Sequence, residues 1–361
     1  MKSNLKPHAC ELMIIGAGMT GMAAALCASH RGIDTVQAGL TGETMYASGL
    51  FDLYGVAHQT TLPIDDPWQG LRALRRDQPR HPFSRLTVGQ IRRAMDRLTA
   101  FLGDAGLAYT GYADKNARLI TCVGTIKRTF RVPATAWAGV KALEEKSSCL
   151  IVDIQGLRGF SARQIVSTLK PAWPDLQAAS IELAWENRLG PKYAEHIARG
   201  LEVEAARQEL GDAIRPHLGR SRYVGLPAVL GIHDTAGVHA DLQRMLKRPV
   251  FEIPTMPPAV AGIRLKEIFE DHIPRLGVRT YLHHSVMALR SRCDGRFEID
   301  VGKTAPETTV IADHVLLATG RFLGKGLVAD RQGIREAIMN LPVHQPENRT
   351  CWHRMPSTWR A

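Results

Sequence analysis

The sequence predicts an α/β protein in which a parallel sheet binds a nucleotide, with a mixed α+β region inserted into it. Three observations favour this fold class. A glycine-rich turn joins a buried strand to a helix near the N-terminus, an apolar strand ends in Ala-Thr-Gly at residue 320, and helices alternate with strands between them. The chain has 361 residues, 45% hydrophobic and 22% charged, which is an ordinary globular composition.

The N-terminal segment has the order strand, turn, helix. The run Leu12–Ile15 is continuously apolar, as expected of a strand buried on both faces, and the stretch 22–30 is rich in Ala, Leu and Met. The turn between them has the pattern G-x-G-x-x-G, and its residues include Gly16, Ala17, Gly18 and Gly21. The first glycine permits the turn, the second lets a phosphate approach the backbone, and the third lets the helix pack close to the strand. With the N–H groups of the helix start, this context predicts a Rossmann-like nucleotide site.

The second strand, expected at 33–36, lacks the acidic residue that usually follows it. A dinucleotide site has Asp or Glu about 20 residues after the glycines, where the carboxylate binds a ribose hydroxyl. Here the strand ends in Val-Gln-Ala-Gly, Asp34 comes too early, and Glu43 lies in the following loop. Either the ribose is held by other groups, or the ligand has no adenosine ribose at this place. FMN satisfies the second alternative.

The segment from residue 261 closes the same sheet. A helix is expected at 261–276, where Gly277 ends it. The strands expected after it are 278–282, 286–289, 297–301, 308–311 and a last one from His314 that ends in Ala318-Thr319-Gly320. We expect this last strand to rejoin the N-terminal sheet, since small residues at its carboxyl end let the backbone pass close to a cofactor.

The middle of the chain alternates between helical and extended patterns. Helices are expected at 86–102, 135–146, 161–170 and 193–210, and strands at 119–123, 126–131, 150–154 and 176–185. The domain division that follows is a nucleotide-binding domain of two segments, 1–60 and 250–340, an inserted mixed region, 61–249, and an irregular tail, 341–361.

The net charge of +11 favours an anionic partner, such as a phosphate, acidic lipid headgroups or an acidic subunit. Part of it lies in a basic cluster that prolines flank: Arg72, Arg75, Arg76, Arg80, His81 and Arg85. This cluster is either a solvated loop or a patch for docking or anion binding. It has no interleaved aromatic residues, so we expect no nucleic-acid partner.

The six cysteines form no C-x-x-C pair and fit no zinc or cluster ligand set, so no metal site is predicted. The N-terminus has no signal-peptide pattern, and no window reaches the length of a membrane span. We therefore expect a cytoplasmic protein with reduced thiols, which a partner subunit can hold at the surface of the inner membrane.

Three further segments are more specific than the glycine turn. They are 47–53 (A-S-G-L-F-D-L), 257–265 (P-P-A-V-A-G-I-R-L) and the stretch from Gly320 through 326–329 to 333–336. With these segments, the chain resembles the B subunit of anaerobic glycerol-3-phosphate dehydrogenase. That family is a flavoprotein family of the FAD/NAD(P)-binding, glutathione-reductase-like fold.

The resemblance implies an oxidoreductase subunit that carries FMN, with FAD as the alternative. Its partners are a catalytic A-type flavoprotein subunit and an iron–sulfur subunit that tethers the pair to the membrane. The complex oxidises sn-glycerol 3-phosphate to dihydroxyacetone phosphate and passes electrons towards quinone and fumarate. The cofactor-binding residues implied are Gly16, Ala17, Gly18 and Gly21 at the phosphate, Ser48 and Gly49 near the flavin ring, and Thr319 and Gly320 at the returning strand. No catalytic residue is identified.

The C-terminal end departs from that family. Its members continue with a strand, a glycine-rich turn and a helix that complete the flavin pocket, and the segment from residue 341 shows none of these patterns. We expect a chain shortened relative to the family, with a more exposed flavin. Two other functions stay open: a non-catalytic scaffolding subunit with an incomplete flavin site, and a stand-alone FAD- or NAD-dependent oxidoreductase.

Overall fold

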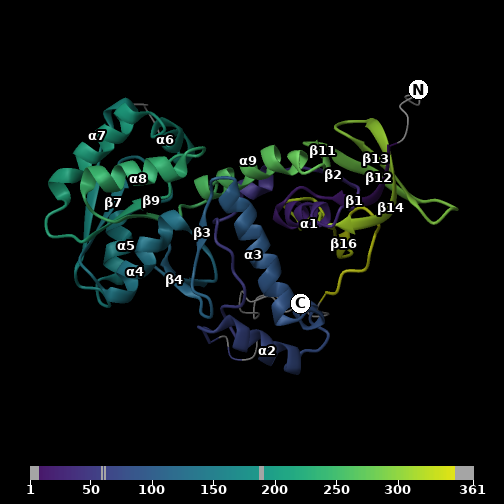
Figure 1. Ribbon diagram of the computed structural model, residues 1–361, viewed down its shortest axis with the longest axis horizontal. Coiled ribbons are helices and arrows are strands. Elements are labelled where there is room, and N and C mark those ends of the chain that lie inside the picture. The colour runs from purple at the N-terminus through teal and green to yellow at the C-terminus, as the bar shows by residue number, and fades with distance from the viewer. Residues whose placement is uncertain (1–7, 58–59, 61, 187–190, 346–361) are drawn as a thin grey trace. The chain divides into compact units, whose positions relative to one another are not determined.

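The computed structural model describes residues 8–57, 60, 62–186 and 191–345 (Figure 1). Internal contacts divide the chain into two units. The first comprises Met1–Thr44 with Leu265–Met355, and the second Met45–Arg264 with Pro356–Ala361. The sequence-based domain bounds, near residues 60 and 250, stay a prediction. Most of the expected tail, 341–361, lies outside the described residues.

The first unit contains a six-stranded sheet with the strand order β11-β2-β1-β14-β13-β12. The strands are β1 (His8–Ile15), β2 (Thr35–Gly39), β11 (Arg279–Leu282), β12 (Ser285–Ser291), β13 (Phe297–Gly302) and β14 (Pro306–Leu317). The four strands β11, β2, β1 and β14 are parallel, and helix α1 (Met19–Ser29) connects β1 to β2. The predicted parallel sheet with its returning last strand is therefore confirmed.

One long strand replaces the two that the sequence predicted at 308–311 and 314–320. The expectation of a break was wrong because β14 serves two partners in succession. Its first part, Pro306–Ala312, pairs with β13 in antiparallel register, and its second part, Val310–Leu317, pairs with β1 in parallel register. The polar pair Asp313-His314 interrupts the apolar pattern, but the hydrogen-bonded ladder to β1 continues past it.

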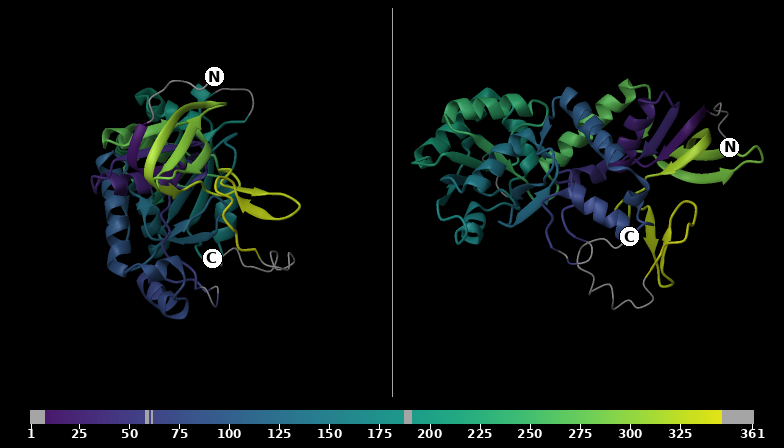
Figure 2. Two further views of the ribbon diagram at one scale, coloured as in Figure 1. Left: turned by 90° about the vertical axis from the view of Figure 1, so that its right-hand side faces the viewer. Right: turned by 60° about the horizontal axis from the view of Figure 1, so that its bottom comes forward.

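Two further elements complete the first unit. Strands β15 (Leu327–Ala329) and β16 (Ile334–Glu336) form an antiparallel ribbon, which stands apart from the six-stranded sheet in Figure 2. The chain passes from one unit to the other at two places. The first lies within η1 (Gly42–Tyr46), after Thr44, and the second lies within helix α9 (Val260–Arg275), after Arg264. Both α1 and α9 lie close to their predicted ranges.

The second unit contains a four-stranded sheet in which all strands are parallel, in the order β10-β9-β7-β8. The strands are β7 (Cys149–Ile154), β8 (Leu176–Ile181), β9 (Tyr223–Pro227) and β10 (Val250–Ile253). The chain leaves β7 towards one edge through α5 (Ala162–Leu169) and leaves β9 towards the other through α8 (Thr235–Leu246). Right-handed crossovers then place these helices on opposite faces, as Figure 1 shows.

The remaining elements of the second unit are shorter or peripheral. They are α2 (Pro67–Asp77), η2 (Pro82–Arg85), α3 (Val88–Asp104), β3 (Tyr109–Thr110), β4 (Ala117–Ile120), β5 (Ile126–Thr129), β6 (Val132–Pro133), η3 (Ala134–Ala136), α4 (Trp137–Glu145), η4 (Ala184–Glu186), α6 (Ala194–Gly200), α7 (Glu204–Ile214) and η5 (Arg215–His217).

Two expectations for this region were wrong. The helix expected at 193–210 is divided into α6 and α7, because the first helix ends at Gly200 and Val203 starts the second. The first arginines of the basic cluster lie on a helix, α2, instead of in a loop. The side chain of Asp66 caps this helix by accepting the N–H groups of Trp68 and Gln69.

A buried ion pair lies in the core of the second unit. The Arg264 guanidinium, 1% exposed, donates to both carboxylate oxygens of Glu252 at 2.8 and 2.9 Å. Thr135 Oγ1 and the Leu230 N–H also donate to this carboxylate, at 2.6 and 2.8 Å, and Arg264 Nε donates to the Gly231 carbonyl. Every strong hydrogen-bonding group of the pair thus has a partner, as a buried charge requires.

Within the part of the chain that the structure describes, no helix is long and apolar enough to cross a membrane.

Candidate functional site

The glycine turn lies at the carboxyl end of β1, between the two neighbouring strands. The Gly16 N–H donates to the Ala38 carbonyl of β2 at 2.7 Å, and the Ala318 N–H donates to the Ile15 carbonyl at 2.8 Å. Backbone hydrogen bonds to both neighbours thus hold the strand end at which the turn begins. In an open α/β sheet, a nucleotide binds at the carboxyl ends of the parallel strands, where this turn lies.

Three glycines are required by the packing of the turn itself. A Cβ on Gly16, whose φ is +125°, would overlap the Ala318 carbonyl oxygen, and one on Gly21 would overlap the Gly16 carbonyl oxygen. A Cβ on Gly39, at the end of β2, would lie 2.5 Å from the Ala17 nitrogen. Sequence reasoning did not single out Gly39, which ends the second strand.

Gly18 differs from the other glycines because open space lies above it. No described heavy atom lies within 4 Å of a Cβ built on this residue, and its φ of −79° suits any side chain. Gly18 is the N-cap of α1, where no side chain caps the first N–H groups and no acidic residue occupies the first turn. The start of α1 therefore offers unpaired backbone donors and a partial positive charge to an anion.

The Gln37 side chain holds the glycine turn through a hydrogen bond. Its side chain is fully buried in β2, and its Nε2 donates to the Gly16 carbonyl at 2.9 Å. Its Oε1 accepts no hydrogen bond within the described residues. The β2 strand, which lacks the expected carboxylate at its end, thus contributes a neutral side chain that binds the glycine turn.

The Glu43 carboxylate lies close to the residues that follow the returning strand. A Cβ on Gly324 would overlap one carboxylate oxygen of Glu43, and a Cβ on Gly320 would lie 3.4 Å from the other. Across the described residues, this side chain has no hydrogen bond or ion pair, and burial raises the pKa of its carboxyl group. A partly buried acceptor without a donor is suited to a ligand hydroxyl.

The predicted site residues fall into two groups. Gly16, Ala17, Gly18, Gly21, Thr319 and Gly320 all belong to the first unit, where Gly16 packs directly against Ala318 and Thr319. Ser48 and Gly49 belong to the second unit, where Gly49 has a φ of +73° and its carbonyl accepts the Tyr109 hydroxyl at 2.8 Å. Their approach to a flavin ring stays a prediction.

Two comparisons with known proteins decide the family. The family profile of the FAD binding domain matches residues 11–361. The probable B subunit of anaerobic glycerol-3-phosphate dehydrogenase from Halobacterium salinarum is 30% identical to this chain over 355 residues, covering 95% of this chain and 81% of that protein. The chain belongs to the family of anaerobic glycerol-3-phosphate dehydrogenase B subunits.

Other members of this B-subunit family match over the same extent. The B subunit of Aliivibrio fischeri is 27% identical and that of Pectobacterium atrosepticum 25%, each over 95% of this chain, and the chain spans 80 and 82% of their lengths. Among solved structures, the 3-ketosteroid delta1-dehydrogenase of Sterolibacterium denitrificans aligns with a TM-score of 0.37 at 14% identity, covering 87% of this chain and 48% of that one.

The glycine turn and the start of α1 fit a flavin nucleotide, the kind of group that the family profile names. The profile match supports flavin binding, and the open space above Gly18 together with the uncapped start of α1 suits the phosphate of a flavin nucleotide. The Glu43 carboxylate, which has no hydrogen bond or ion pair within the described residues, is an acceptor near the end of the returning strand. A bound flavin would supply the electron-transfer chemistry, and the chain's own residues would bind and orient it.

Proposed function

We propose that this chain is the flavin-carrying B subunit of a complex that oxidises sn-glycerol 3-phosphate to dihydroxyacetone phosphate and passes the electrons towards quinone, with fumarate as a terminal acceptor. Membership of the B-subunit family carries the proposal. The geometry of the glycine turn supports it, since the turn offers backbone donors and open space for an anionic cofactor.

In this proposal each part of the turn has one task. The first N–H groups of α1 bind the flavin phosphate, and Gly18 leaves room for it. Thr319 and Gly320 let the returning strand pass close to the cofactor, and Ser48 and Gly49 approach the flavin ring. Glu43 accepts a hydroxyl of the sugar chain, because its carboxylate lacks any other donor in the described chain.

We propose FMN as the cofactor, with FAD as the alternative. The argument for FMN is that β2 ends without the carboxylate that binds an adenosine ribose. The family profile is that of an FAD binding domain, which favours the alternative. Purification followed by release and chromatography of the bound flavin distinguishes the two.

The remaining parts of the proposal concern the partners. We propose a catalytic A-type subunit and an iron–sulfur subunit at the inner membrane as the partners, with this chain on the cytoplasmic side. The test is reduction of the flavin absorption band by sn-glycerol 3-phosphate in the assembled complex. A complex that oxidises this substrate equally well without this chain would contradict the electron-transfer role.

A further inference from the structure

The end of α2, the turn after it and η2 carry three arginines that have no carboxylate partner within the described residues. Arg75, Arg80 and Arg85 are exposed, and none of them has an ion pair or hydrogen bond within the described residues. We call these three arginines together with His81 the basic turn. They lie within eleven consecutive residues, 75–85.

The acidic residues closest in sequence are engaged by other arginines. Asp77 pairs with Arg76 at 2.9 Å, and Asp66 lies 4.0 Å from Arg72. Within the described residues, no carboxylate therefore pairs with an arginine of the basic turn. Most arginines elsewhere in the second unit do have a carboxylate partner, as Arg207 has with Asp241 at 2.9 Å.

The backbone of the basic turn is held in one conformation. The Gln78 carbonyl accepts both the His81 N–H at 3.0 Å and the Ser84 hydroxyl at 2.7 Å, and the Ser84 N–H donates to the His81 carbonyl. Pro79 and Pro82 restrict the chain on either side of Arg80. A binding surface that is already ordered loses little conformational entropy when a ligand arrives.

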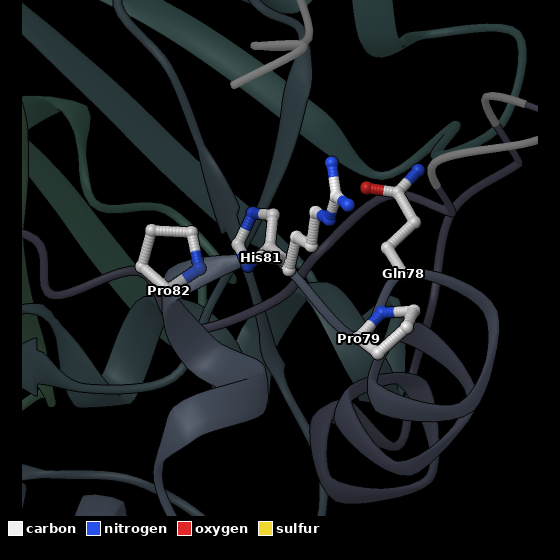
Figure 3. Close-up of a pocket in the computed structure, with 5 residues that line it drawn as sticks. Gln78, Pro79, His81 and Pro82 are labelled. Atoms are coloured by element: carbon white, nitrogen blue, oxygen red, sulfur yellow. The ribbon is translucent and has the colours of Figure 1, made fainter.

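Side chains of this turn surround an open hollow of about 560 Å³, which Gln78, Pro79, Arg80, His81 and Pro82 line (Figure 3). This volume is in the range of about 300–1,000 Å³ of small-ligand sites. His81 Nδ1 accepts the Phe83 N–H at 3.2 Å, so the hydrogen of the neutral ring lies on Nε2. The hollow thus contains the Arg80 guanidinium, an imidazole ring and the Gln78 amide as donors.

We propose that the basic turn is a binding site for a phosphate group. The Arg80 guanidinium lines the hollow and can bind two phosphate oxygens by parallel hydrogen bonds, while Arg75 on α2 and Arg85 on η2 add positive charge on the adjoining elements. The helix dipole does not help, because the C-terminal end of α2 is its negative end. Arg80 must therefore make the main contact with the anion. The phosphate is that of a soluble phosphate compound or of a lipid headgroup, and the flavin site is not required for it.

The test uses the full chain and two probes. The first arm titrates inorganic phosphate by calorimetry, with chloride at equal ionic strength as the reference. The second arm measures co-sedimentation with phosphatidylglycerol vesicles, with phosphatidylcholine vesicles as the reference. Saturable binding of phosphate supports the soluble source, and binding to the anionic vesicles alone supports the lipid source.

Variants assign the binding to this turn. Arg80→Ala should weaken the binding at least about tenfold, as expected for the loss of a charge-assisted hydrogen bond, and Arg85→Ala, which removes a charge from the adjoining η2, should weaken it less. Arg163→Ala, which removes an exposed arginine without a described partner from α5, should change it less than about twofold. The proposal is overturned if neither probe binds, or if Arg80→Ala and Arg85→Ala bind as the unaltered chain does.

Discussion

Gly18 and Gly21 belong to the same motif, but their surroundings differ, so we expect different consequences when each is replaced by alanine. A methyl group at Gly18 enters open space, whereas one at Gly21 overlaps the Gly16 carbonyl oxygen. We expect Gly18→Ala to weaken flavin binding at least about tenfold, because the methyl occupies the path of the phosphate. Its free energy of unfolding should change by less than about 1 kcal/mol. Flavin fluorescence titration and urea unfolding measure the two effects.

Gly21→Ala is the contrasting variant and Gly103→Ala the control. The first should lose about 1–3 kcal/mol of stability as well as flavin, since the backbone must shift. Gly103 lies on α3, where a Cβ meets no described atom within 4 Å, and its substitution should leave flavin binding unchanged. If the Gly18→Ala protein binds flavin as tightly as the unaltered chain, the proposal that the flavin phosphate binds beside Gly18 is wrong.

Glu43→Gln should separate binding from stability. The amide keeps one acceptor but loses the charge, so flavin affinity should fall by about a factor of five, the difference between a charged and a neutral hydrogen bond. Burial raises the pKa of Glu43 above its ordinary value of 4.5, so the folded state binds the proton more tightly and stability declines as pH rises from 4.5 through the folded pKa.

At neutral pH, this variant is therefore expected to gain stability and to lose flavin affinity. Glu43→Gln should unfold at a slightly higher urea concentration than the unaltered chain, while it binds flavin more weakly. Asp34→Asn, on an exposed side chain of the same unit, is the control for both measurements. Unchanged flavin affinity in Glu43→Gln would exclude a contact between this carboxylate and the cofactor, and would leave the flavin site itself intact.

At the scale of elements, sequence reasoning located the strands that are bounded by clear signals. The turn after β1 has a fixed glycine spacing, and β7 is a continuous apolar run, so both were predictable. Strands β9 and β10 were missed because their apolar runs are interrupted, by Gly225 and Pro227 in β9 and by Glu252 in β10. Consequently the second parallel sheet was predicted only as a mixed region.

The family-like segment around Arg264 has a structural explanation that the sequence alone could not provide. Arg264 lies on α9 and its partner Glu252 on β10, so the pair forms only when the helix packs on the sheet. Similarly, Gly49 packs so close to Ala261 that a Cβ would lie 2.6 Å from the Cβ of that residue. Contacts between distant segments depend on the assembled fold, and spacing does not encode them.

Breaking the Arg264–Glu252 pair should destabilise the second unit strongly. Arg264→Met leaves a carboxylate that is 4% exposed without its counter-ion, at an expected cost of about 3–5 kcal/mol in the free energy of unfolding. The double variant Arg264→Met, Glu252→Leu removes both charges and should recover most of this loss. Urea unfolding followed by circular dichroism measures it, and a single variant as stable as the unaltered chain would contradict the role of the pair.

At the scale of the whole molecule, carboxylates stabilised by the fold predict the response to acid. Burial alone would raise the pKa of Glu202, but the N–H groups of Ile232, His233 and Asp234 donate to its carboxylate at 2.8, 2.5 and 3.3 Å. The net pKa of Glu202 therefore lies below its ordinary value of 4.5. Glu252 behaves in the same way, since burial opposes its ionisation but the charge and hydrogen bonds of Arg264 outweigh burial and lower its pKa.

These two carboxylates stabilise the fold fully above pH 4.5, where they are ionised in both states. Below pH 4.5 the unfolded chain takes up protons first, so the free energy of unfolding should fall as the pH falls through the folded pKa values. The net charge of +11 grows more positive over the same range and adds repulsion. Added KCl should remove the repulsive part, because salt screens charges at the surface, and should leave the part that belongs to the buried Glu252.

Glu202→Gln should lose stability at neutral pH and show a smaller decline with acid. A free energy of unfolding that stays constant from about pH 6 to pH 3 would contradict the assigned direction of both pKa shifts.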